Sequence, residues 1–256
     1  MKLGLIGTGI IGEAMIKGLY RVGKFEGSSM VSLRTAERSS KLAAEFPLVA
    51  VAKDNQEIVD FADLLILAVL PEQCESVMQG LNFKEGQTIL SIVSSITLKS
   101  LGDWGAPVTK IYRGIPLPPI EFGLGPFPIC PPAPELDSLL NSVGTVVSLT
   151  NEDQFLSIAV GSAMMAMFYE VVSTTAGYME KEGLPASESA LYASSMMYAL
   201  ADSTMRVNHE GLHQMSEDCL TPGGLNEQVL HGLRGRNWYT ELEGEMDRIR
   251  DRLSKY

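Results

Sequence analysis

Three glycines near the amino terminus constrain the fold of this chain more than any other feature. The segment Gly7-Thr8-Gly9-Ile10-Ile11-Gly12 directly follows an apolar run at residues 3–6. In this pattern the first glycine allows a tight turn, the second lets backbone approach a pyrophosphate, and the third allows close packing of helix on strand. The amino end of the following helix then faces the phosphates. We therefore predict a dinucleotide-binding turn whose cofactor-binding residues are Gly7, Thr8, Gly9, Ile10, Ile11 and Gly12.

Short apolar runs alternate with amphipathic stretches over residues 1–115. Strands are predicted at residues 3–6, 30–33, 64–69, 89–93 and 108–112, and helices at 13–22, 36–46, 56–61 and 71–81. Strand and helix in alternation indicate a mostly parallel sheet with right-handed crossovers. The predicted fold class is α/β, with an N-terminal Rossmann-like dinucleotide-binding domain.

Proline content changes abruptly after this region, because eight of the 13 prolines fall within residues 116–134. Proline lacks the backbone N–H that sheets and helix interiors need, so we predict extended connecting chain here. A helix at 133–143 and a strand at 145–149 are predicted to close the first domain, which we bound at residues 1–150.

The remaining residues, 151–256, are predicted to form an all-α substrate and dimerisation domain. Helices expected at 152–182 and 186–208 are apolar on nearly every face, and such helices have to be buried on all sides. A domain of this size cannot bury both alone, so we predict a homodimer or higher oligomer through the C-terminal helices. An ordinary methionine-rich core is the alternative.

Residues 155–179 nearly have the length of a bilayer span. Glu170 lies near the centre of this segment and no basic residues flank it, which favours a buried helix over a membrane helix. Glycines interrupt the first apolar stretch of the chain, so we expect no signal peptide.

Charge and cysteine content exclude several classes of protein. Acidic residues outnumber basic ones by 31 to 20, a net charge of −11, and nucleic-acid or acidic-membrane binders are typically basic. The three cysteines, Cys74, Cys130 and Cys219, are too few and too scattered for a disulfide framework. We expect a cytoplasmic protein that binds neither nucleic acid nor membrane.

The choice of cofactor depends on the end of the second predicted strand. An acidic residue there would bind a ribose 2′-hydroxyl, but this chain has Ser32 and Arg34. A hydroxyl and a guanidinium suit a 2′-phosphate, which favours NADP(H), with NAD(H) as the alternative. Arg34 could instead be a solvated loop charge.

A second informative turn is Thr221-Pro222-Gly223-Gly224. Threonine can cap a helix, proline suits the first helical position, and the uncovered amides of Gly223 and Gly224 would form a pocket for a carboxylate. A plain capped helix start explains the same residues equally well.

The segment from His209 to His213 matches the His-Glu-x-x-His pattern of zinc proteases. Gly211 weakens the helix that this geometry requires, and His231 is the only other histidine available as a ligand. We therefore predict no metal site.

These features together resemble the pyrroline-5-carboxylate reductase family over essentially the full chain. The matching stretches are residues 7–15, 66–71, 113–116 and 221–224, and the last is the most specific. The resemblance implies NADPH-dependent reduction of a cyclic imine, 1-pyrroline-5-carboxylate to proline, in amino-acid biosynthesis. It adds Ala68, Val69, Leu70 and Pro71 to the cofactor-binding residues. It also implies Thr221, Gly223, Gly224 and Asn226 as substrate-binding residues, with Asn226 and Thr221 in catalytic roles.

The chain departs from the family pattern at Leu70, Leu117, Ala163, Met164 and Asn226. Leu70 replaces a usual lysine, and Asn226 replaces a threonine that hydrogen-bonds the substrate. These departures leave three alternatives: reduction of a different imine, reduction of a keto acid, or a non-catalytic NADPH-binding sensor. Keto-acid reductases of related architecture place a lysine on the long interdomain helix, and residues 155–179 contain none.

Overall fold

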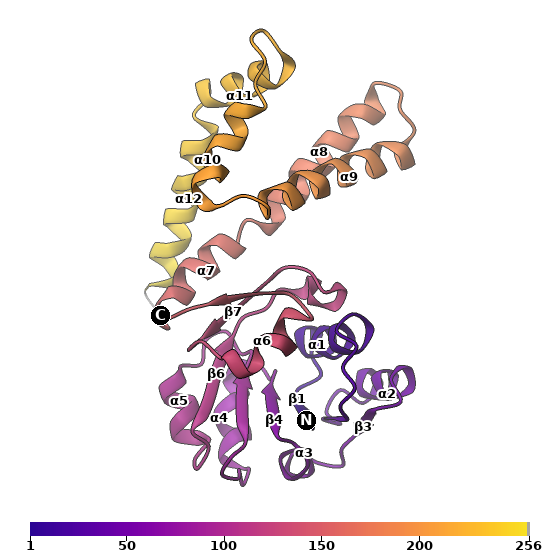
Figure 1. Cartoon of the computed structure of the whole chain (residues 1–256), viewed down its shortest axis with the longest axis vertical. Helices are drawn as coiled ribbons and strands as arrows, with labels where there is room; N and C mark the ends of the chain where they lie inside the picture. Colours follow the sequence, from indigo (N-terminus) through magenta and orange to yellow (C-terminus); the bar gives the residue numbers. More distant parts are fainter. Residues whose placement is uncertain (255–256) are drawn as a thin grey trace. The chain divides into compact units, whose positions relative to one another are not determined.

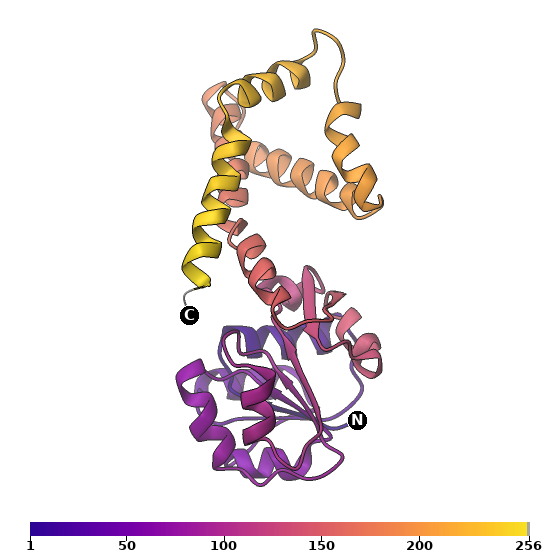
Figure 2. The ribbon, with the colours of Figure 1, turned by 90° about the vertical axis from the view of Figure 1, so that its left-hand side faces the viewer.

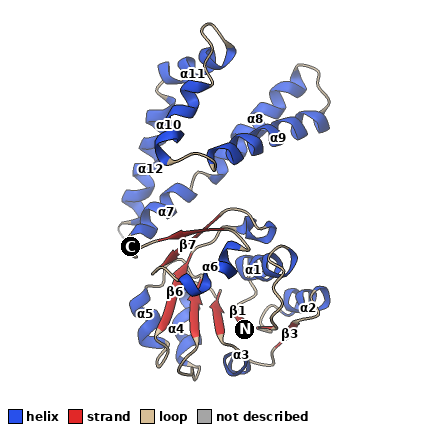
Figure 3. Ribbon diagram, in the orientation of Figure 1, coloured by secondary structure: helices blue, strands red, loops and turns tan. Residues whose placement is uncertain are grey.

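The computed structural model describes residues 1–254, apart from the side chains of His209 and His213. The chain divides into two compact units, Met1–Phe155 and Leu156–Tyr256, and each is described by itself. The first holds a sheet with helices on both faces, and the described part of the second is helical (Figures 1 and 3). The predicted fold class, a Rossmann-like unit followed by a helical one, is confirmed.

The described residues of the first unit form an eight-stranded sheet in the order β3-β2-β1-β4-β5-β6-β7-β8. Its strands are β1 (Leu3–Ile6), β2 (Ser29–Val31), β3 (Val49–Val51), β4 (Leu64–Leu67), β5 (Thr88–Ser91), β6 (Lys110–Gly114), β7 (Pro126–Cys130) and β8 (Thr145–Ser148). Strands β1 to β6 run parallel, β7 is antiparallel to β6, and β8 is parallel to β7. The sheet is therefore mostly parallel, as predicted.

Helices cover both faces of this sheet, because alternate residues of each buried strand point to opposite sides (Figure 2). They are α1 (Ile10–Arg21), α2 (Ala36–Glu45), α3 (Asn55–Phe61), α4 (Pro71–Gln79), α5 (Leu98–Trp104) and α6 (Pro134–Asn141), with a 3₁₀ turn η1 (Pro118–Phe122). Leu5 of β1 belongs to the same core as Leu19 of α1. Ile6 of β1 belongs to a second core that contains Met78 of α4.

The prediction of extended connecting chain over residues 116–134 is wrong in part, because this segment contains η1 and β7. The backbone of β7 faces its two neighbours alternately. The carbonyl oxygens of Gly125 and Ile129 accept hydrogen bonds from the β8 side, from Thr145 N and Leu149 N, each at 2.8 Å. Pro126 and Pro128 therefore face β6, whose pairing with β7 is confined to two residue pairs. A proline nitrogen without a hydrogen is tolerated there.

The helical unit comprises α7 (Gln154–Ser162), α8 (Met165–Lys181), α9 (Ala186–Thr204), α10 (His209–Asp218), α11 (Leu225–Gly235) and α12 (Trp238–Leu253). The single helix predicted at 152–182 is interrupted at Ala163 and Met164, directly after Gly161 and Ser162. The Ser162 hydroxyl donates to Ile158 O at 2.8 Å, and Gly/Ser pairs are common sites of helix breaks. Helices α8 and α9 pack against each other.

Apolar side chains of this unit remain exposed in the single chain. No residue of α8 is buried, and in α9 only Ser189 and Ala193 are. Leu191 of α9 is 71% exposed. Residues Gln154–Lys181 are also long and apolar enough to cross a membrane, judged by length and composition. The exposure of these apolar side chains on α8 and α9 is therefore not explained by the fold of the single chain.

Candidate functional site

The glycine turn lies between β1 and α1, and its three glycines have different surroundings. Gly7 has a φ of +103°, and a Cβ there would lie 2.5 Å from Ala68 O. A Cβ on Gly12 would lie 2.3 Å from Gly7 O. Around Gly9 the space is open, since the nearest atom to a Cβ would be Ala68 O at 4.0 Å. Gly7 and Gly12 let the turn close, and the open side of Gly9 leaves room for a phosphate group.

The amino end of α1 is the second part of this site. Gly9 is the residue preceding the helix and supplies no side-chain cap. The first amides of α1 are therefore not satisfied by a capping side chain, and the positive end of the helix dipole favours an anion there. The geometry of the turn fits the pyrophosphate of a dinucleotide.

Two of the predicted cofactor residues support the turn from behind. Ser32 is 2% exposed, and its hydroxyl accepts a hydrogen bond from Gly7 N at 2.9 Å. Thr8 is 1% exposed, with its hydroxyl 3.0 Å from that of Ser39. Ser39 in turn donates to Ser32 O at 2.6 Å. This buried hydroxyl chain fastens the glycine turn to β2 and α2.

Exposed apolar side chains surround the same edge of the sheet. Ile10 is 67% exposed, Leu33 is 48% exposed and Leu70 is 57% exposed. Since the carboxyl ends of the adjacent parallel strands β1, β2 and β4 share this edge, all three residues lie at the edge where a doubly wound sheet binds ligands. Ile11, Ala68, Val69 and Pro71 are half-buried. Among the predicted cofactor residues, Ile10 and Leu70 are the apolar ones most available to cover a ring system.

Arg34 follows β2 as predicted and is exposed at the same edge. Its guanidinium donates a hydrogen bond to the side-chain carbonyl of Gln73 in the first turn of α4. The other arginine of this loop region, Arg38, lies 3.6 Å from a carboxylate oxygen of Glu13. Arg34 is therefore bound to a neutral side chain, whereas Arg38 lies beside a carboxylate.

A buried ion pair that sequence reasoning missed lies at the carboxyl end of β6. Arg113 is 6% exposed, and its guanidinium contacts the carboxylate of Glu152. It also donates to Ser94 O at 2.6 Å and lies 4.8 Å from the centre of the Phe155 ring. Glu152 accepts a further bond from Leu98 N at 2.8 Å. The pair joins the ends of β5 and β6 to the last residues of the first unit.

The turn before α11 differs from the predicted capped helix start. Gly224 N donates to Thr221 O at 2.7 Å, which closes a tight turn around Pro222 and Gly223, and Gly223 has a φ of +72°. The helix begins at Leu225, so Thr221 is not its cap and Pro222 is not its first residue. Proline followed by a glycine with positive φ is the sequence of a type II turn. The turn ends directly before the helix instead of forming its first residues.

Both glycine amides of this turn have partners within the chain. While Gly224 N is bound to Thr221 O, Gly223 N donates to a carboxylate oxygen of Glu227 at 2.7 Å. Asn226 donates from its side chain to Cys219 O at 3.2 Å. The amide that we predicted to bind a substrate carboxylate therefore already binds a carboxylate, which belongs to the protein.

The buried cysteines of the first unit have structural roles. Burial raises the pKa of the Cys74 thiol to about 11, and burial together with the charge of Glu152 raises that of Cys130. Among the described residues, no group of three potential ligands could hold a metal ion. The side chains of His209 and His213, which carry the zinc-protease pattern, lie outside the described part of the structure.

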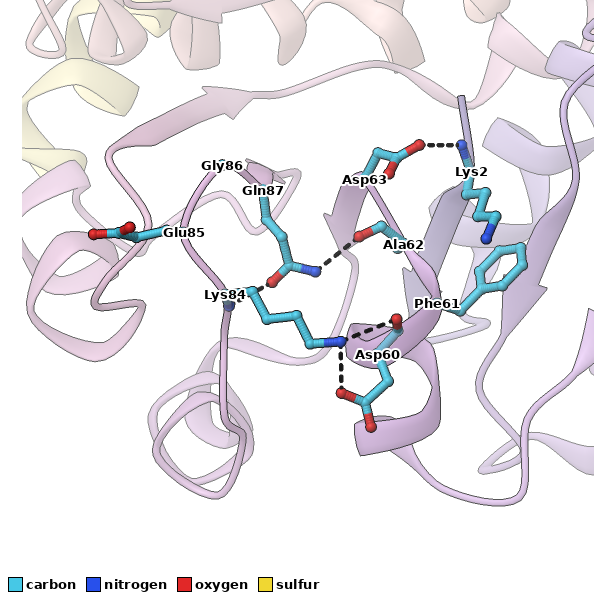
Figure 4. A pocket seen from close by; sticks show the side chains of 9 residues that line it. All are labelled: Lys2, Asp60, Phe61, Ala62, Asp63, Lys84, Glu85, Gly86 and Gln87. Carbon is cyan, nitrogen blue, oxygen red and sulfur yellow. Dashed lines mark hydrogen bonds and ion pairs between the residues drawn. The ribbon is translucent and has the colours of Figure 1, made fainter.

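A shallow pocket at the amino ends of β1, β4 and β5 holds several polar and charged groups, and most of them interact with one another (Figure 4). Lys84 lies 2.9 Å from Asp60, Lys2 N donates to Asp63 at 2.8 Å, and the Gln87 amide donates to Ala62 O at 2.7 Å. This edge is opposite to the glycine turn, and the pocket is best explained as a junction between strand ends.

Comparison with known proteins finds similar sequences over nearly the whole chain. A family described as NADP oxidoreductase, coenzyme F420-dependent, matches residues 2–95. Pyrroline-5-carboxylate reductase of Pseudomonas aeruginosa is 25% identical over 99% of this chain and 96% of its own length.

Two solved structures share the fold. Pyrroline-5-carboxylate reductase of Coxiella burnetii covers 99% of this chain and 97% of its own at 20% identity, with a TM-score of 0.84. The Plasmodium falciparum pyrroline carboxylate reductase with NADP bound covers 98% and 96% at 16% identity, with a TM-score of 0.76. With its glycine turn, its Thr-Pro-Gly-Gly turn and a match over nearly the full length of both chains, this chain is similar to the pyrroline-5-carboxylate reductases.

Proposed function

We propose that this protein is an NADPH-dependent oxidoreductase that reduces a C=N bond, with 1-pyrroline-5-carboxylate as substrate and proline as product. The observation that carries the proposal is the glycine turn at the carboxyl end of β1, opening on the uncapped helix α1, in a chain related over its full length to reductases of this name. NADPH, when bound, supplies the hydride for the carbon of the C=N bond, and a proton on nitrogen completes the secondary amine.

The residues around the glycine turn would hold the cofactor. Gly7, Gly9 and Gly12 admit the pyrophosphate, and the amides at the start of α1 face it. Thr8 and Ser32 keep the turn in place through buried hydrogen bonds. Arg34 supplies a positive charge for a 2′-phosphate, which favours NADP(H), and NAD(H) is the alternative cofactor.

The turn before α11 would hold the substrate carboxylate. Gly223 N would contact it by exchanging the Glu227 carboxylate for that of the substrate, within the turn formed by Thr221 and Gly224. The side-chain amide of Asn226 would bond the ring nitrogen, its oxygen accepting from the protonated nitrogen, or an ordered water. A cyclic imine enters already protonated at nitrogen, so these groups have to orient it and need not supply a strong acid. Asn226 and Thr221 are therefore assigned catalytic positioning roles in this proposal.

The assay is oxidation of NADPH by purified protein in the presence of 1-pyrroline-5-carboxylate. Turnover above background supports the proposal. Cofactor binding without turnover on any cyclic imino acid would instead identify a non-catalytic NADPH-binding protein. Turnover on other imines or on keto acids alone would retain the reductase and change its substrate.

A homodimer formed through the helical unit is part of the proposal. The exposed apolar residues of α9 line a groove that contains Leu191, Tyr192 and Met196. A second copy is favoured over lipid as the occupant because Glu170 lies within α8 and the helix is interrupted before Met165. Light scattering should give a mass of twice 27.8 kDa or a higher multiple, in the absence of detergent. A monomer would refute the proposed homodimer.

We also propose a cytoplasmic location, because the chain has only three cysteines and an acidic composition.

A further inference from the structure

The hydrogen bond between Arg34 and Gln73 crosses the opening above the glycine turn. Arg34 lies in the loop after β2, and Gln73 lies in α4, which follows β4. Strand β1 is situated between β2 and β4 in the sheet. The two side chains therefore meet from opposite sides of the carboxyl end of β1, where the adenosine part of a dinucleotide has to pass.

The chemistry of this contact preserves the charge of Arg34. A carboxylate partner would offset part of the positive potential of a guanidinium. The nearby Arg38 has such a partner in Glu13, at 3.6 Å, which Glu13 shares with Lys17. Gln73 accepts the same kind of hydrogen bond with a neutral carbonyl oxygen. Within the described residues, the ion pairs do not include Arg34. Its guanidinium is held in place and keeps its full charge.

The uncharged side chain of Gln73 matters because the surrounding residues are acidic. The chain carries a net charge of −11, and Glu72 and Glu75 flank Gln73 on α4. A phosphate approaching this edge is opposed by the overall field and depends on local cations. One more carboxylate at position 73 would be placed directly on the one cation that we assign to the 2′-phosphate.

We propose that Gln73 is a specificity-determining residue for the cofactor: it orients Arg34 toward the 2′-phosphate of NADPH without neutralising it. This inference rests on the proposed cofactor site and extends it to a residue on a different element. Gln73 acts through Arg34, so it is a positioning residue. Its signature is a change in the preference for phosphorylated over unphosphorylated ligands, which a merely structural role would not produce.

The test measures binding to the full chain by calorimetry with two probes, adenosine 2′,5′-bisphosphate and adenosine 5′-monophosphate. Gln73→Glu should weaken binding of the bisphosphate by about five- to tenfold, through charge pairing with Arg34 and repulsion of the ligand. Binding of the monophosphate should change by less than about twofold. Asn82→Asp is the matched control, because it adds the same charge at an exposed position beyond the other end of α4.

Arg34→Leu separates the two levels of the inference. If Arg34→Leu leaves the preference for the bisphosphate unchanged, the proposed 2′-phosphate site itself is refuted. If Arg34→Leu abolishes the preference but Gln73→Glu behaves like Asn82→Asp, the role of Gln73 is refuted and the site stands. A thermal melt of each variant should match that of the unmodified protein, since both side chains are at the surface. NADPH against NADH turnover gives an independent second readout of the same ratio.

Discussion

The backbone N–H of Gly223 donates a hydrogen bond to the carboxylate of Glu227 at 2.7 Å. The proposed function assigns the same N–H to the substrate carboxylate. Substrate binding then requires that this hydrogen bond be given up, or that two carboxylates approach each other. Glu227→Gln removes the negative charge while retaining a hydrogen-bond acceptor of similar size. If the two carboxylates compete, this change should strengthen binding of a carboxylated substrate.

The magnitude follows from the contact. A hydrogen bond to a charged group contributes about 1.5–3 kcal/mol when buried, and Glu227 is half-exposed, so about 1–1.5 kcal/mol is appropriate here. That corresponds to a decrease in KM of about five- to twelvefold for 1-pyrroline-5-carboxylate, since 1.4 kcal/mol is a factor of ten. The value of kcat should change little, because the effect concerns binding of a group remote from the C=N bond.

The assay compares 1-pyrroline-5-carboxylate with 1-pyrroline, which has the same ring and no carboxylate. Only the carboxylated substrate should gain from Glu227→Gln, and Glu243→Gln on α12 serves as the matched control at an exposed position. An unchanged or increased KM for the carboxylated substrate would refute the competition. Equal gains for both substrates would show that the change acts on something other than the carboxylate.

Three further outcomes are expected. Glu152→Ala should lower the free energy of unfolding by about 3 kcal/mol in urea denaturation, because it leaves a buried guanidinium unpaired, and a loss below about 1 kcal/mol would contradict the burial of the pair. Burial, with the neighbouring Glu135, raises the pKa of Tyr112 to about 12, so the folded state keeps this proton at a pH where the unfolded chain loses it. Stability should therefore fall as the pH rises from about 10 to about 12, and the fall should be smaller in Tyr112→Phe when both are followed by thermal melts. Alkylation of the native protein at pH 8 should modify the exposed Cys219 and spare the buried Cys74, whose pKa is raised to about 11; mass spectrometry showing equal labelling would count against this core.

The sequence predicted those elements whose signal is local. Residues 3–6 are a buried apolar run closed by a glycine pattern, and β1 has the predicted bounds. The three-residue strand β3 is too short for any periodicity to reveal it. Strand β7 was missed because its prolines argue against pairing. They are accepted because Pro126 and Pro128 face β6, which pairs with β7 at only two residue pairs.

In the candidate sites, too, features with a local sequence signal were predictable and contacts between distant residues were not. The glycine turn was predictable because it depends on one short segment with strict steric requirements. The bond between Arg34 and Gln73 joins residues 39 positions apart, and so does the pair of Arg113 and Glu152. No local pattern marks such contacts, because they depend on which strands become neighbours. The start of α11 was misplaced because a Pro-Gly sequence fits both a type II turn and a helix start.

The reversal of β7 has a practical consequence for dividing this protein into parts. Because β7 and β8 run against β6, the chain returns after β8 to the carboxyl end of β6, where Glu152 meets Arg113. A fragment ending at residue 150 would contain every strand of the sheet and still lack the partner of its most buried cation. A fragment ending after Phe155 would keep both the carboxylate and the aromatic ring that cover the guanidinium. The boundary of the first unit is therefore set by an ion pair beyond the last strand, and the sheet alone does not define it.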